Sequence, residues 1–251
     1  MDLGIEIKDY SGNCEEHGDY STTQSFLVGQ WRGGECPQCV ETKQLREEGE
    51  LRAKRLSDIV AHLLRASGIP ARYEASTLDT YKPTTERSKG IHASLVRYVA
   101  DFQTHKDTGT SIALLGEAGT GKTHLGCAIV SGVIHGGLAK AHFTTVTKMI
   151  RRVRATYNSQ ATESEGEVLE FLINRDLLVI DEIGVQSGSD HEHNILFEVI
   201  NERYANLRPT LVLSNLGAEK IREVLGERVM DRFREGGAII TFDWGSFRGN
   251  K

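Results

Sequence analysis

Short apolar runs alternate with helical stripes through the second half of the chain. The run Ile112–Leu115 predicts a buried strand, and a helical pattern from Lys122 to about His135 follows it. Further strands are predicted at Ala141–Thr145, Leu177–Ile180, Thr210–Leu213 and Ala238–Phe242, and further helices at Val146–Tyr157, about Glu192–Ala205 and about Glu219–Leu225. The stretch between Tyr157 and Leu177 is acidic, and no element is predicted there. This alternation predicts an α/β fold with a parallel sheet flanked by helices on both faces.

A different pattern precedes the alternation. Apolar residues at spacings of three and four predict an amphipathic helix over residues 41–66; they are Leu56, Ile59, Val60, Leu63 and Leu64. Gly68-Ile69-Pro70 ends this helix. Such a helix either packs on the main domain or forms an arm that binds a partner or lies near DNA. We therefore expect three parts: a small module at 1–40, a helical linker or arm at 41–67, and the α/β domain at 68–251.

The charge of the chain is unevenly distributed. The formal net charge is −5, and residues 1–40 hold seven of the 35 acids but only two of the 30 bases. The remaining 211 residues are therefore neutral overall and can still present a local basic surface to nucleic acid. No stretch approaches 18 apolar residues, and the acidic start lacks the pattern of a signal peptide. We expect a cytoplasmic protein without a membrane partner.

Three of the four cysteines lie in the acidic first 40 residues. Cys14 and His17 form one pair and Cys36 and Cys39 a second, each with two intervening residues. Three thiolates and one imidazole suit a closed zinc site, and a module this small needs such a site for stability. Unliganded thiols remain the alternative. The fourth cysteine, Cys127, is interpreted as a small buried residue.

A complete phosphate-binding loop follows the first predicted strand of the domain. Its eight residues are Gly116, Glu117, Ala118, Gly119, Thr120, Gly121, Lys122 and Thr123. Glycines allow successive backbone N–H groups to point into one concavity, and the following helix adds its amino-terminal potential. Lys122 is expected to reach the terminal phosphates of ATP, and the Thr123 hydroxyl to bind Mg²⁺.

Polar residues end two later strands. Asp181 follows the buried run Leu177–Ile180, where a carboxylate is suited to hold Mg²⁺, and Glu182 is placed to activate a water for attack on the γ-phosphate. Asn215 follows another apolar strand and is a candidate to position the same water. Glu182 as a solvated charge and Asn215 as a turn residue are the alternatives.

These motifs, together with the string Leu225-Gly226-Glu227-Arg228-Val229-Met230-Asp231-Arg232, resemble the DnaC-type replicative helicase loaders, which are AAA+ ATPases. The resemblance covers roughly residues 66–250 and implies a P-loop ATPase that binds ATP or ADP. It implies that Arg232 is the arginine finger acting on ATP of a neighbouring subunit, with Arg228 a nearby second candidate. Arg248 falls near the sensor 2 arginine, unless it is a solvated surface residue. The Cys/His module departs from the cellular loaders and is similar to phage-type loaders.

The resemblance also implies partners. Such loaders assemble as multimers on a hexameric replicative helicase and place it on single-stranded DNA. The helix Val146–Tyr157 lies where the family contacts that DNA, and it carries Lys148, Arg151, Arg152, Arg154 and Tyr157 without an acid. An ordinary solvated basic face is the alternative. Two other functions stay open: a transposition helper ATPase of the IstB type, and a nucleotide-gated DNA-binding module that hydrolyses little ATP.

Overall fold

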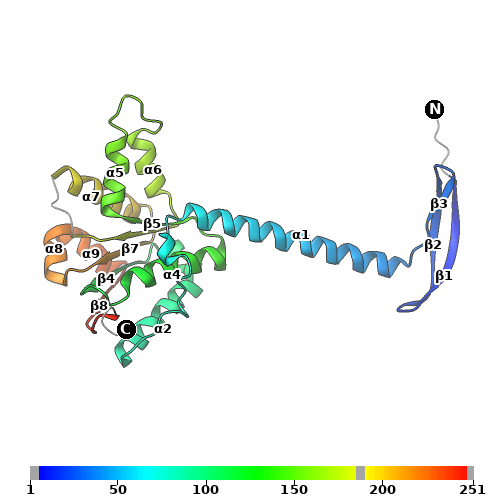
Figure 1. Ribbon diagram of the computed structural model, residues 1–251, viewed down its shortest axis with the longest axis horizontal. Helices are drawn as coiled ribbons and strands as arrows, with labels where there is room; N and C mark the ends of the chain where they lie inside the picture. Colours follow the sequence, from blue (N-terminus) through cyan, green and yellow to red (C-terminus); the bar gives the residue numbers. More distant parts are fainter. Residues whose placement is uncertain (1–5, 185–189, 248–251) are drawn as a thin grey trace. The chain divides into compact units, whose positions relative to one another are not determined.

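The computed structural model describes residues 6–184 and 190–247. The chain divides into two compact units, residues 1–58 and 59–251, and helix α1 (Pro37–Ala66) contributes to both. Figure 1 colours the chain from its amino end to its carboxyl end. No helix among the described residues combines the length and the apolar character needed to cross a membrane.

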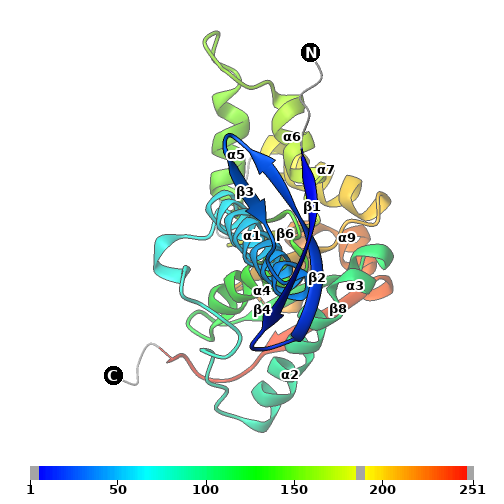
Figure 2. The same ribbon diagram turned by 90° about the vertical axis from the view of Figure 1, so that its right-hand side faces the viewer.

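The first unit contains an antiparallel sheet that the sequence analysis did not predict. Its strands are β1 (Ile7–Cys14), β2 (Gly18–Leu27) and β3 (Gln30–Gly33), in the order β1-β2-β3 (Figure 2). Among residues 6–58, Cys36 is the only buried residue. An apolar core therefore does not hold this unit together.

The second unit is built on a five-stranded parallel sheet in the order β5-β6-β7-β4-β8. The strands are β4 (Ser111–Gly116), β5 (Ala141–Thr145), β6 (Leu177–Asp181), β7 (Thr210–Ser214) and β8 (Gly237–Phe242). Every residue of β6 and β7 is buried, as a strand covered on both faces requires.

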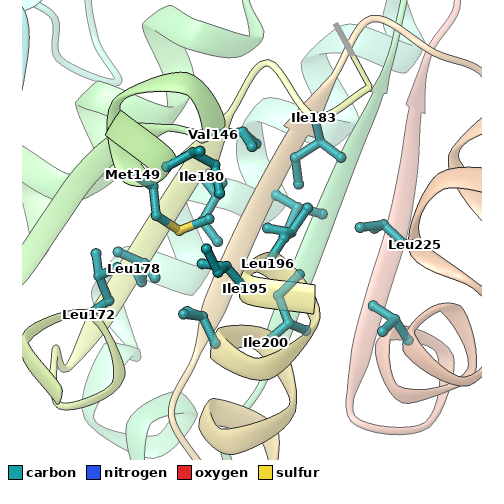
Figure 3. Packing of buried hydrophobic residues seen from close by; sticks show 14 of the residues in the cluster. Val146, Met149, Leu172, Leu178, Ile180, Ile183, Ile195, Leu196, Ile200 and Leu225 are labelled. Carbon is teal, nitrogen blue, oxygen red and sulfur yellow. The ribbon is translucent and has the colours of Figure 1, made fainter. Parts of the chain in front are cut away.

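Helices cover both faces of this sheet (Figure 1). One face packs against α2 (Glu86–Ala100), α3 (Phe102–Thr108) and α4 (Lys122–Gly137). The other packs against α5 (Val146–Ala155), α6 (Glu165–Ile173), α7 (Asp190–Ala205), α8 (Ala218–Leu225) and α9 (Glu227–Glu235). Figure 3 shows buried side chains of this cluster, among them Ile195 and Leu196 of α7 and Ile180 of β6. The predicted α/β fold class is confirmed.

Helices α6 and α9 of the second unit were not predicted from sequence. Helix α6 lies in the stretch described only as acidic, and it begins at a capping box in which Ser164 and Glu167 exchange hydrogen bonds. Helix α9 follows α8 after the single residue Gly226, whose φ of 78° breaks the helix. The acids at 165 and 167 lie in the first turn of this helix, where negative charge is favourable.

Only part of the apolar stripe of α1 packs on the core of the second unit. Val60, Leu63 and Leu64 are half-buried and pack on the core under α2 and α4, whereas Leu56 and Ile59 are exposed. The chain that leaves α1 continues along the edge strand β5, where Phe143 N donates a hydrogen bond to Ser67 O at 2.7 Å. The end of α1 thus packs on the domain.

Candidate functional site

The phosphate-binding loop connects β4 to α4 and is shaped by glycines. Gly116, Gly119 and Gly121 have φ values of 138°, 87° and 94°, which favour glycine. A Cβ at Gly121 would lie 2.6 Å from the Tyr81 ring, so a side chain there is excluded by space as well. The segment after β8 also holds the loop in place. Trp244 Nε1 donates a hydrogen bond to Thr120 O, and Phe247 N donates one to Gly119 O.

Lys122 begins α4 with its side chain folded into the loop. Its Nζ donates to Gly116 O and Glu117 O, both at 2.7 Å, and to Thr120 Oγ1 at 3.1 Å. The loop therefore holds a nearly buried ammonium group beside the amino end of a helix. Both features favour an anion such as a nucleotide phosphate.

Thr123 and Asp181 meet although 58 positions separate them in sequence. Thr123 Oγ1 donates to Asp181 Oδ2 at 2.7 Å, and Glu182 N donates to Asp181 Oδ1 at 2.7 Å. Burial raises the pKa of Asp181, while these two hydrogen bonds and the Lys122 charge oppose that rise. A hydroxyl and a carboxylate oxygen are ligands that suit Mg²⁺, so this donor set fits the ion.

The remaining polar residues line the same cleft, which has a volume of about 390 Å³. Glu182 and Asn215 are exposed at its edge, and Glu182 has a φ of 63°, unusual for a residue with a side chain. Tyr73 and His124 line the cleft as well and were not predicted. His124 could have been found from sequence because it directly follows the loop motif. Tyr73 belongs to a single turn of 3-10 helix, for which the sequence has no recognisable residue spacing.

The profile of the family described as "IstB-like ATP binding protein" matches residues 40–240. The chain belongs to this family. The replicative helicase loader DnaC of Escherichia coli strain K12 is 34% identical over 183 residues, which are 72% of this chain and 73% of DnaC. DnaC of Buchnera aphidicola subsp. Baizongia pistaciae is 32% identical over 209 residues, 83% of each chain.

Solved structures agree with the fold of this ATP-binding family. A crystal structure of the DnaC helicase loader superimposes with a TM-score of 0.62 at 23% identity and covers 69% of this chain and 99% of that one. DnaA from Aquifex aeolicus bound to AMPPCP superimposes with a TM-score of 0.56 at 18% identity, covering 69% of this chain and 51% of that one. The second unit therefore has the AAA+ P-loop fold.

The Cys/His cluster lies before the part of the chain that matches the IstB-like profile. The ligand atoms of Cys14, His17, Cys36 and Cys39 lie within 4.8 Å of one another. Cys14 Sγ is 3.5 Å from Cys39 Sγ, and His17 Nδ1 is 3.3 Å from Cys39 Sγ. Tetrahedral zinc would place such atoms about 3.5 to 3.8 Å apart, so the four residues fit this ion.

Backbone geometry favours metal binding at the first cysteine of the cluster. The N–H groups of Glu16 and His17 lower the pKa of the Cys14 thiol to about 6. The thiolate, which is the metal-binding form, is thereby the favoured form at neutral pH. Cys127, on α4, is fully buried in the core, as its interpretation from sequence requires.

The five predicted DNA-contacting residues do not form one free basic patch. Lys148 and Arg151 are exposed and have no ion pair within the described residues. Arg152 makes two hydrogen bonds to Glu163, at 2.6 and 3.1 Å, and its guanidinium lies over the Phe171 ring. Arg154 pairs with Glu192 at 2.9 Å; Tyr157 Oη lies 2.8 Å from His191 Nε2.

The arginines of α9 have different surroundings. Arg228 is exposed, whereas the Arg232 guanidinium lies 4.7 Å from the centroid of the Tyr204 ring. Arg232 Nη1 is buried without a hydrogen-bond partner in the described part of the chain. Arg248 lies outside the described residues.

Proposed function

We propose that this protein is an ATP-dependent loader of the replicative DNA helicase. The observation that carries the proposal is the 34% identity to a replicative helicase loader over 183 residues, in a chain that retains a complete nucleotide site. The output of such a protein is assembly of a partner on single-stranded DNA, with ATP binding and hydrolysis controlling the assembly.

The polar residues of the cleft that were predicted from sequence have distinct roles in the proposed ATPase. The loop Gly116–Thr123 and Lys122 bind the phosphates of ATP, and Thr123 with Asp181 would hold Mg²⁺. When bound, Mg²⁺ would neutralise charge on the β- and γ-phosphates. Glu182 takes the proton of the attacking water, and Asn215 orients that water. Arg248 is assigned to the bound nucleotide from sequence alone.

Hydrolysis is proposed to depend on assembly. Arg232 of a neighbouring subunit would stabilise charge on the γ-phosphate, with Arg228 as the second candidate. Its stacking on Tyr204 and its unpaired Nη1 imply that Arg232 leaves this position when a neighbour binds. Self-association is therefore part of the proposed cycle.

The DNA surface is assigned to α5. Lys148 and Arg151 are exposed and available to phosphates. Arg152 and Arg154 of the same helix, and Tyr157 shortly after its end, carry groups that already have partners. Clustered cations with an aromatic side chain suit single-stranded DNA.

The module at 1–40 is proposed to bind zinc through Cys14, His17, Cys36 and Cys39 and to contact protein. Its excess of acids makes it a poor partner for phosphates, so the helicase is the partner we assign to it. The linker at 41–67 connects it to the ATPase at 68–251 and is a second candidate for docking the helicase, because Leu56 and Ile59 remain exposed.

A second candidate function comes from the family profile itself. Its description, "IstB-like ATP binding protein", covers residues 40–240 and favours a transposition helper ATPase that acts on DNA. The two functions differ in their protein partner. Co-purification of the full chain with ATP analogue and either a replicative helicase or a transposase distinguishes them.

Loading itself is the decisive test. The full chain, ATP and a hexameric replicative helicase are mixed with single-stranded DNA circles, and helicase retained on the circles is measured after gel filtration. We expect retention to rise with the wild-type protein and to stay at the level of helicase alone with Lys122→Ala. Equal retention with and without the wild-type protein would refute the loader function.

A further inference from the structure

The end of α5 is tied to the first turn of α7 by two contacts. Arg154 Nη2 pairs with Glu192 Oε1 at 2.9 Å, and Tyr157 Oη bonds to His191 Nε2 at 2.8 Å. Arg154 of α5 and Tyr157, which lies two residues after the end of this helix, both belong to the surface assigned above to single-stranded DNA. Glu192 of α7 thus forms an ion pair with an arginine that would otherwise be available to a DNA phosphate.

Arg154 is the cation of α5 best placed to change partner. Arg152 is fixed by two hydrogen bonds to Glu163 and by the Phe171 ring, whereas the ion pair of Arg154 within the described residues is with Glu192. The Arg154 side chain is 56% exposed and can be reached from solvent.

Glu192 is held close to that cation by its burial. Its side chain is only 15% exposed, and its carboxylate lies 2.9 Å from the Arg154 guanidinium. A carboxylate in this position competes with phosphate for the guanidinium and repels the negative backbone of DNA.

We propose that Glu192 restrains the affinity of α5 for single-stranded DNA by competing with a backbone phosphate for Arg154. This inference rests on the assignment of α5 as the DNA surface. Glu192 acts through Arg154 and is therefore a positioning residue that sets binding strength. Its contact with Arg154 was not predicted from sequence, because 38 positions separate the two residues.

The test measures binding of the full chain to a fluorescent oligothymidine by anisotropy over a series of salt concentrations. We expect Glu192→Gln to bind about fivefold more tightly, as loss of one competing ion pair allows. We also expect the slope of log K against log salt to steepen by about 0.7, because Arg154 gains one phosphate contact. Unchanged or weaker binding by a folded Glu192→Gln protein would overturn the proposal.

Glu163→Gln is the matched control, since it also removes one acid that pairs with an α5 arginine. An equal gain in affinity in both variants would indicate a general charge effect and overturn the proposal. In the Arg154→Ala background, Glu192→Gln is expected to give no gain, and a persistent gain would also overturn it.

The DNA surface is tested separately with Lys148→Ala combined with Arg151→Ala. If this variant binds DNA like the wild type, the α5 assignment and the role of Glu192 both fail. If it binds more weakly while Glu192→Gln does not bind more tightly, only the role of Glu192 fails. Thermal melting of each variant verifies that it is folded.

Discussion

The Thr123 hydroxyl donates a hydrogen bond to the Asp181 carboxylate across 2.7 Å and joins the first turn of α4 to the last residue of β6. Two oxygen ligands for one cation are thereby brought together by the fold itself. Glu182, the next residue, extends into the cleft from the same strand end. Binding of the metal-nucleotide is thus assigned to Thr123 and Asp181, and activation of water to Glu182. Substitution of one residue at a time can therefore test the two functions separately.

Replacing Glu182 with Gln is expected to abolish turnover while leaving ATP binding intact. The amide keeps the size of the side chain but cannot accept the proton of the attacking water, so the rate of ATP hydrolysis is expected to fall by about 100-fold or more. Phosphate release measures the rate, and a fluorescent ATP analogue measures affinity. Glu219→Gln on α8 is the control and should match the wild type. Equal turnover in Glu182→Gln would remove this residue from the mechanism.

The Cys/His cluster is expected to hold one zinc ion per chain. Cys39→Ser removes a ligand whose Sγ lies 3.5 Å from Cys14 Sγ, and it should lower the zinc content of the purified protein several-fold. Elemental analysis by mass spectrometry measures zinc. Cys127→Ser, at a buried thiol outside the cluster, should keep the wild-type content. Wild-type protein that contains no zinc after purification without chelators would contradict the assignment.

Stability is expected to fall in mild acid because of His142. Burial lowers the pKa of this imidazole from 6.5 to about 4, so the unfolded chain binds the proton more readily between these values. The contribution of the neutral imidazole to the free energy of unfolding is present above pH 6.5. About 3 kcal/mol of it is lost as the pH falls to 4. Urea unfolding at pH 7 and pH 5 measures the loss, and His142→Asn should show a smaller one. An equal loss of unfolding free energy in both proteins would show that titratable groups other than His142 cause it.

Arg203 is expected to be indispensable for folding. Its fully buried guanidinium donates to the carbonyl oxygens of Leu172, Ile173, Arg175 and Pro209 and to Thr210 Oγ1. Arg203→Met leaves these acceptors unpaired and should lower the free energy of unfolding by about 3 kcal/mol or more. Arg208→Met, which removes a 33% exposed side chain whose guanidinium is 3.5 Å from the Asp176 carboxylate, should cost less than about 1 kcal/mol. Similar urea midpoints for the two variants would contradict this ranking.

Removal of residues 1–58 is expected to abolish tight binding to the helicase. A chain that begins at Ile59 lacks the Cys/His module and the part of α1 before Ile59 but retains the sheet and the nucleotide cleft. Surface-immobilised helicase and a concentration series of each protein measure the affinity. Full affinity of the shortened chain would show that docking uses the ATPase unit alone.

The nucleotide cleft was the most predictable part of the molecule. The loop Gly116–Thr123 is contiguous. Asp181 ends β6 and Asn215 follows β7, and the carboxyl ends of these strands share one edge of a parallel sheet. Local sequence therefore determines where these residues meet. The sheet β1-β2-β3 was missed because its strands mix polar and small residues without a buried apolar face.

Contacts between distant side chains were beyond sequence reasoning. The helix Val146–Tyr157 carries no acid and was expected to present four free cations, yet Glu163 and Glu192 from outside it pair with Arg152 and Arg154. The packing of α5 against its neighbours decides these pairs. The signal for α6 was present in Ser164 and Glu167, since a serine followed three residues later by glutamate is typical of a capping box.

The hydrogen bond from Phe143 N to Ser67 O has a consequence for the solution behaviour of the protein. Strand β5 ends the sheet, and an uncovered strand edge is a template for pairing with other chains. The segment that follows α1 covers part of this edge in every molecule. Cleavage after residue 67 would expose it and favour edge-to-edge aggregation, whereas cleavage before Ile59 keeps the cover in place.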